Sequence, residues 1–148
     1  MAQVRRAEAR WQGDLLGGSG EMRVATSGAI ATLPITWRAR AEADDTGMTS
    51  PEELLAAAHA SCFAMACAHK LAGAGTPAAS LEVAVAVTAE KTDAGWTVIS
   101  SAITVRGKVP GADAAAFAAA AEGAKDGCPI SRAIKGNVTI TVEPTLVA

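Results

Sequence analysis

The chain has 148 residues, a length that fits one domain spanning 1–148 with a core of ordinary size. Apolar residues make up 50% of the sequence, but aromatic residues are few and alanine is abundant, which predicts close packing by small side chains. Small side chains each bury little area, so the core would gain from a partner subunit. The formal net charge is −2 and no basic run is present, which argues against a nucleic-acid partner.

The N-terminal stretch MAQVRRAEAR has no apolar core of the kind that a secretory signal carries. The longest apolar stretch is interrupted by His59 and Ser61, so we expect no membrane span. We therefore expect a cytoplasmic protein. In that compartment three cysteines are not a disulfide framework, and they are buried spectators, metal ligands or reactive thiols.

The first third of the chain favours short strands. We predict strands over 4–12, 21–26 and 34–40, with a glycine-rich turn between the first two. The stretch EADDTGMT, residues 42–49, reads as an acidic loop.

A long buried helix is predicted next. Ser50 is a suitable N-cap, Pro51 fits the first helical position, and Glu53 completes a capping box. Nearly every residue over 54–68 is apolar or small, and a helix that is apolar all round lies inside a protein. Residues that stop a helix follow: Gly73, Gly75 and Pro77.

The second half of the chain predicts a hairpin, two helices and a last strand. Valine and alanine alternate over 81–91, TDAG makes a turn, and 96–109 returns as the paired strand. An alanine-rich helix ends near Gly127, a short helix covers 128–134, and an alternating strand covers 137–147. This order indicates an α+β domain with mostly antiparallel sheets.

Cys62 lies about three turns into the buried helix. A free cysteine is often an inert small hydrophobe, and that interpretation stays open here. The effect of the helix N-terminus on a pKa fades within the first turn, so it does not activate this thiol. A reactive Cys62 would need a cationic neighbour from elsewhere in the fold.

Cys128 precedes Pro129, where a short helix can begin. Free backbone amides and the helix dipole would stabilise a thiolate there, although a buried cap residue is the alternative. Cys67 is five residues after Cys62, or about 140° around a helix. The two thiols therefore face different directions, and we interpret Cys67 as a packing residue.

Metal binding is the remaining role for these side chains. His59 and Cys62 share a helix face, and together with Cys128 they could in principle hold zinc. No C-x-x-C or H-E-x-x-H pattern is present, so we expect no metal site. We interpret His59 as a satisfied core or interface residue and His69 as solvated.

Two blocks of sequence resemble the OsmC/Ohr family of organic hydroperoxide reductases. One is SPEELLAAAHASCFAMA around Cys62, and the other is KDGCPISRAI around Cys128. The resemblance extends to RWQGDL, EKTDAGW and VPGADAAAF, and the AAHASC form is closer to the OsmC branch. It implies antiparallel sheets packed around a long buried central helix, in an intertwined homodimer with active sites at the interface.

The resemblance also implies the site. Cys62 matches the family's peroxidatic cysteine, Cys128 its resolving cysteine and Glu52 its carboxylate. Arg40 is the best match to the family's arginine, with Arg38 as the fallback. No metal, haem or other cofactor is implied. The implied partners are an organic hydroperoxide and a dithiol reductant, such as a lipoyl group or dihydrolipoamide.

The resemblance thus implies a hydroperoxide reductase in which Cys62 becomes a sulfenic acid and then a Cys62–Cys128 disulfide. The apolar surroundings of Cys62 would favour alkyl or fatty-acid hydroperoxides. Two other classes remain: a thiol-based redox sensor without turnover, and a binder of small apolar ligands.

Overall fold

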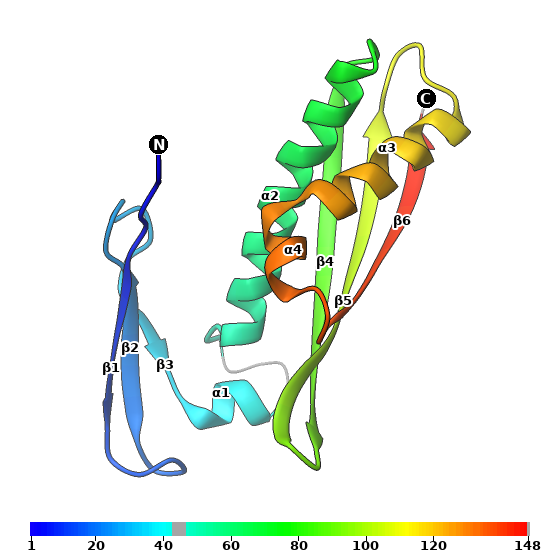
Figure 1. Cartoon of the computed structure of the whole chain (residues 1–148). Helices are drawn as coiled ribbons and strands as arrows, with labels where there is room; N and C mark the ends of the chain where they lie inside the picture. Colours follow the sequence, from blue (N-terminus) through cyan, green and yellow to red (C-terminus); the bar gives the residue numbers. More distant parts are fainter. Residues whose placement is uncertain (43–46, 148) are drawn as a thin grey trace. The chain divides into compact units, whose positions relative to one another are not determined.

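The computed structural model describes residues 1–42 and 47–147, so part of the predicted acidic loop lies outside the described residues. The described residues form strands and helices in this chain order: β1 (Ala7–Gln12), β2 (Ser19–Val24), β3 (Leu33–Ile35), α1 (Trp37–Ala41), α2 (Pro51–Gly73), β4 (Ser80–Thr92), β5 (Gly95–Lys108), α3 (Ala114–Gly127), α4 (Pro129–Ile134) and β6 (Thr139–Val147). The α+β class is as predicted (Figure 1). The chain divides into two compact units, residues 1–51 and 52–148, and the prediction of a single domain over 1–148 stays a prediction.

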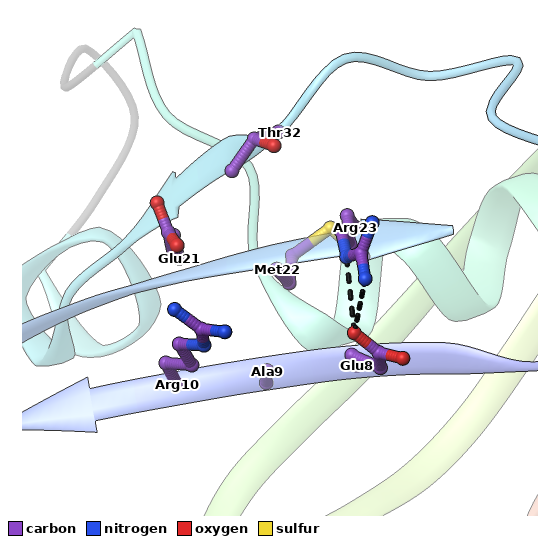
Figure 2. A pocket seen from close by; sticks show the side chains of 7 residues that line it. All are labelled: Glu8, Ala9, Arg10, Glu21, Met22, Arg23 and Thr32. Carbon is purple, nitrogen blue, oxygen red and sulfur yellow. Dashed lines mark hydrogen bonds and ion pairs between the residues drawn. The ribbon is translucent and has the colours of Figure 1, made fainter. Parts of the chain in front are cut away.

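The first unit is a three-stranded antiparallel sheet in the order β1-β2-β3, followed by α1. Arg23 of β2 reaches across to Glu8 of β1 and pairs with its carboxylate at 2.6 Å (Figure 2). The prediction of a strand over 34–40 is wrong beyond β3. Thr36 accepts a hydrogen bond from the Ala39 amide at 3.1 Å, and this cap starts a helix where alternation alone suggested a strand.

The second unit contains a three-stranded sheet in the order β4-β5-β6. Strands β4 and β5 form the predicted hairpin, with Thr92 opposite Gly95 at the turn. Strand β6 pairs with β5 in parallel, so this sheet is mixed rather than antiparallel. A parallel neighbour needs a crossover connection, which α3 and α4 supply.

The core lies between this sheet and its helices, which cover one face of it in Figure 1. From α2 one stripe is buried, at i, i+4 spacing: His59, Phe63, Cys67 and Leu71. Strand β5 contributes alternate residues, including Ile103 and Val105. Gly107 of β5 leaves room for Phe117 of α3, and an added Cβ would lie 2.5 Å from the ring.

Helix α2 begins at Pro51 and ends at Gly73, as its sequence signals predict. The helix was expected to be buried on all sides, but within this single chain only one face is buried. Met65, on another face, is 68% exposed. By length and composition alone α2 could cross a membrane, since an 18-residue window has a mean hydropathy of 1.3. By this criterion the stretch is long and apolar enough despite His59 and Ser61, and the expectation of no membrane span stays a prediction. The core helix of a soluble protein passes the same test, and α2 packs a stripe against the sheet in that way.

Candidate active site

The structure brings Cys62 and Cys128 together, although they lie far apart in the sequence. Cys62 is half-buried on α2 and Cys128 is fully buried at the start of α4. The two thiols lie close enough that each shifts the pKa of the other. Both are free cysteines here, so the pair is positioned for thiol–disulfide chemistry without being bridged.

The backbone of Cys128 is held on both sides. Its amide donates to the Ala124 carbonyl at 2.8 Å, which closes α3, and its carbonyl accepts from the Arg132 amide at 3.0 Å, which opens α4. Pro129 occupies the first turn of α4, where a missing amide hydrogen costs nothing. This confirms the short helix predicted after Cys128 and fixes the position from which its sulfur projects.

The two thiols have pKa values shifted in opposite directions. Burial raises the pKa of Cys62, the Ile130 amide opposes that effect, and the contact with Cys128 raises the pKa further. Burial alone would also raise the pKa of Cys128. Hydrogen bonds from the Ser131 amide, the Cys62 thiol and the Ser131 hydroxyl outweigh burial, so the pKa of Cys128 is lowered. Within this unit Cys128 is therefore the more acidic thiol of the pair, as expected for a thiol at a helix start.

A shallow, mainly apolar groove of about 340 Å³ opens beside Cys62. Residues of α2, the end of α3 and the start of α4 line it: Cys62, Met65, Ala66, His69, Lys70, Ala124, Gly127 and Pro129. Lys70 supplies the ammonium group of this groove, and its side-chain stem passes over Gly123 and Gly127. An apolar molecule lying in the groove would have the half-buried Cys62 sulfur within its walls.

The other predicted site residues lie at some distance along the chain. Arg40 is on α1 in the first unit, with its guanidinium 6.0 Å from the centre of the Trp37 ring. Arg38, the fallback, pairs with Glu42 one turn away at 3.0 Å. Glu52 is in the first turn of α2, and ten residues of continuous helix put it about 15 Å from Cys62 along the axis. The roles of Arg40 and Glu52 stay predictions.

His59 is a site residue whose partners the sequence did not reveal. It is fully buried on α2, one turn before Cys62, and Ser101 Oγ lies 2.8 Å from Nδ1. Ser131 Oγ lies 2.7 Å from Nε2. The prediction of a satisfied core histidine is confirmed. Both partners are serines on other elements, and no local sequence signal pointed to either contact.

The remaining cysteine and histidine behave as expected. Cys67 is fully buried in the hydrophobic core, and burial raises its pKa. His69 is exposed on α2. Among residues 1–42 and 47–147, no group of three histidine, cysteine or acidic side chains is arranged to hold a metal ion.

A second hollow of about 340 Å³ lies on the first unit, over β1 and β2. Its walls carry paired charges from the two strands, as Figure 2 shows for Glu8 and Arg23, and no cysteine or histidine lines it. It holds no thiol or imidazole, so it is a polar surface feature rather than a candidate active site.

Comparison with known proteins identifies the family. The profile of the OsmC-like protein family matches residues 43–143. Peroxiredoxin OsmC of Escherichia coli strain K12 is 35% identical over 136 residues, which cover 92% of this chain and 93% of the relative.

The chain belongs to the OsmC family. The resemblance seen in the two cysteine blocks is thereby confirmed.

Solved structures share the fold of this OsmC-family chain. An organic hydroperoxide resistance protein from Elizabethkingia anophelis superposes with a TM-score of 0.75 at 18% identity and covers 99% of this chain and 100% of its own. The organic hydroperoxide resistance protein OsmC of Legionella pneumophila gives 0.69 at 23% identity, covering 97% and 99%. At these identities the likeness establishes the fold.

Proposed function

We propose that this OsmC-family chain is a thiol peroxidase that reduces organic hydroperoxides to alcohols. The observation that carries the proposal is the proximity of Cys62 to Cys128, with Cys62 in the wall of an apolar groove. Peroxiredoxin OsmC of Escherichia coli, similar over nearly the whole chain, supports the same chemistry. We also propose a cytoplasmic location, where reducing systems keep both thiols free.

Cys62 is the peroxidatic residue in this proposal, because it is the partly exposed sulfur of the pair. Its thiolate attacks the outer oxygen of ROOH and breaks the O–O bond. The alkoxide takes up a proton and leaves as ROH, and Cys62 becomes a sulfenic acid. Burial raises the pKa of Cys62, so this step needs a cation near the sulfur. Arg40 is the proposed cation, oriented by a forked ion pair with Glu52.

Cys128 is the resolving residue. Its thiolate attacks the sulfenic sulfur, and the hydroxyl leaves as water once protonated, which gives a Cys62–Cys128 disulfide. A dithiol, of the lipoyl or dihydrolipoamide type, then exchanges with that disulfide and is itself oxidised to a cyclic disulfide. The lowered pKa of Cys128 makes it the better thiolate for the condensation.

We propose that the active unit is an intertwined homodimer with the site at its interface. Exposed apolar surface on α2, including Met65, supports a second subunit. Glu52 is too far along α2 to reach the cysteine of its own helix, so a two-fold mate would bring Glu52 to the opposite site.

Consumption of cumene hydroperoxide with dihydrolipoamide tests the peroxidase proposal. We expect multiple turnovers for the wild type, no turnover for Cys62→Ser, and sulfinic acid on Cys62 in Cys128→Ser. Equal rates in all three proteins would refute the proposal. A single cycle without turnover would instead identify a redox sensor, and ligand binding that survives Cys62→Ser without any oxidation would identify an apolar-ligand binder.

A further inference from the structure

A buried chain of hydrogen bonds runs from β5 through α2 to Ser131, one turn after the resolving cysteine. Ser101 Oγ contacts His59 Nδ1 at 2.8 Å, and His59 Nε2 contacts Ser131 Oγ at 2.7 Å. Ser131 lies one turn after Cys128, in α4, and its hydroxyl lowers the pKa of that thiol. All four side chains are at most 3% exposed, so water does not compete for these bonds.

The direction of this chain follows from the number of hydrogens available. Ser131 has one hydroxyl hydrogen, so a Ser131 hydroxyl that donates to the Cys128 sulfur accepts from His59 Nε2–H. Burial lowers the pKa of His59, so the ring is neutral and Nδ1 carries no hydrogen. Ser101 therefore donates to Nδ1. Every donor then meets one acceptor, and the chain ends on the sulfur.

We propose that His59 is a positioning residue that holds the Ser131 hydroxyl as a fixed donor to the Cys128 thiolate. Without His59 the hydroxyl could rotate to another acceptor, and its donation to sulfur would lapse. Successive hydrogen bonds in such a chain polarise one another. The bond that His59 donates to Ser131 therefore strengthens the bond that Ser131 donates in turn.

This inference rests on the proposed function in what it says about turnover. The thiolate that the Ser131 hydroxyl stabilises is Cys128, which is the leaving group when a reductant cleaves the disulfide. Cys62 is the partly exposed sulfur and Cys128 is fully buried, so a reductant thiolate attacks Cys62. A bond forms between the reductant and Cys62, the S–S bond breaks, and Cys128 leaves with the electron pair. The second thiol of the reductant then displaces Cys62. A leaving thiolate of lower pKa departs faster, so the hydrogen-bond chain accelerates this step.

The direct test measures the pKa of Cys128 where it is the only thiol. In a Cys62→Ser, Cys67→Ala background, thiolate absorbance is titrated with and without Ser131→Ala. We expect Ser131→Ala to raise the pKa of Cys128 by about one unit, since hydrogen bonds to charged groups are the strong ones. Ser61→Ala is the matched control, because Ser61 is exposed and donates to the Ala58 carbonyl within its own helix.

His59 itself is tested by two substitutions in the same background. His59→Gln keeps an N–H donor near the position of Nε2 and should retain part of the effect. His59→Leu removes the donor and should raise the pKa of Cys128 as Ser131→Ala does. Circular dichroism confirms folding, and if a His59 variant unfolds, Ser131→Ala and its Ser61→Ala control still decide the question.

A kinetic readout separates this inference from the proposed function. With otherwise wild-type cysteines, Ser131→Ala should slow reduction of the disulfide by dihydrolipoamide by about threefold, since rates of exchange follow the pKa of the leaving thiol. Oxidation of Cys62 by cumene hydroperoxide should not slow, because a Cys128 that carries less negative charge raises the pKa of Cys62 less. An unaltered pKa of Cys128 in folded Ser131→Ala would overturn the inference. Failure of any hydroperoxide to oxidise Cys62 would refute the peroxidase while the pKa measurement still stood.

Discussion

Phe117 of α3 lies directly over Gly107 of β5, so close that a Cβ at Gly107 would be 2.5 Å from the ring. No real side chain tolerates that distance without movement, and both residues are buried in the core. The glycine therefore sets how near α3 approaches the sheet, and through α3 it positions Cys128 at the helix end.

Gly107→Ala should destabilise the protein by about 1–3 kcal/mol, because the core must shift to admit the methyl group. Urea unfolding measures the change. Gly73→Ala is the matched control, since a Cβ there meets no atom within 4 Å, and it should be neutral. Equal stability of the two variants would show that Gly107 does not set the helix–sheet spacing.

Cys67→Ala should reduce stability without affecting activity. Cys67 is fully buried in the core and takes no part in the sulfur pair, so loss of its sulfur should cost about 1 kcal/mol through a small cavity. Urea unfolding and hydroperoxide turnover are measured on the same preparation. A variant that folds normally but loses turnover would contradict the packing role.

Stability should fall as pH decreases below about 6.5, the ordinary pKa of histidine. Burial lowers the pKa of His59, so the unfolded chain binds a proton there before the folded chain does. The contribution of His59 to stability is thus complete above the pKa that His59 has in the unfolded chain. It is lost as the pH falls toward the pKa that His59 has in the folded chain, at no more than about 1.4 kcal/mol per pH unit. Urea midpoints at about pH 7.5 and about pH 5.5 measure this loss.

His59→Gln should flatten this pH dependence, whereas the exposed His69→Gln should leave it unchanged. The same slope in wild type and His59→Gln would mean that another group controls acid sensitivity.

Lys70→Gln should weaken selection for anionic substrates. The Lys70 ammonium is the cation of the groove that contains Cys62, so it can pair with the carboxylate of a fatty-acid hydroperoxide. An exposed ion pair contributes about 0.2–1 kcal/mol, which predicts a rise in KM of up to about fivefold for that substrate. KM for neutral cumene hydroperoxide should not change. A parallel rise for both substrates would argue against charge recognition.

Met65→Asp should shift the proposed dimer toward monomer. Met65 is 68% exposed in the single chain, and a carboxylate buried there against a second subunit would lose its hydration. Sedimentation velocity gives the oligomeric state of wild type and variant. Glu53→Gln, at an exposed position of the same helix, is the control. A wild type that sediments as a monomer would refute the dimer.

Local signals in the sequence predicted most of the second unit. Pro51 and Gly73 set the bounds of α2, alternating valines set the β4–β5 hairpin, and Cys128 with Pro129 marks the start of α4. These features depend on neighbours in sequence, which one chain displays directly. The pairing of Cys62 with Cys128 came from the family resemblance, and the structure brings the two thiols close enough to shift each other's pKa.

Other features depend on contacts that the sequence does not display. Alternation in β6 shows which residues face the core but not whether the strand runs parallel to β5. The helix at Trp37–Ala41 follows from a cap at Thr36 that outweighs a short alternating pattern. The link between His59 and Ser131 joins α2 to α4, and only the folded chain brings them together.

The Cys128 sulfur lies at the end of a helix whose other contacts are already fixed. Phe117, Ala121 and Ala124 are buried along one side of α3, and Cys128 is the next residue on that side. One residue inserted or removed between Phe117 and Cys128 would turn the sulfur by about 100°. The outer side of this stretch therefore tolerates changes of residue type. An insertion or deletion is not tolerated, because the number of residues between Phe117 and Cys128 fixes the direction of the Cys128 sulfur.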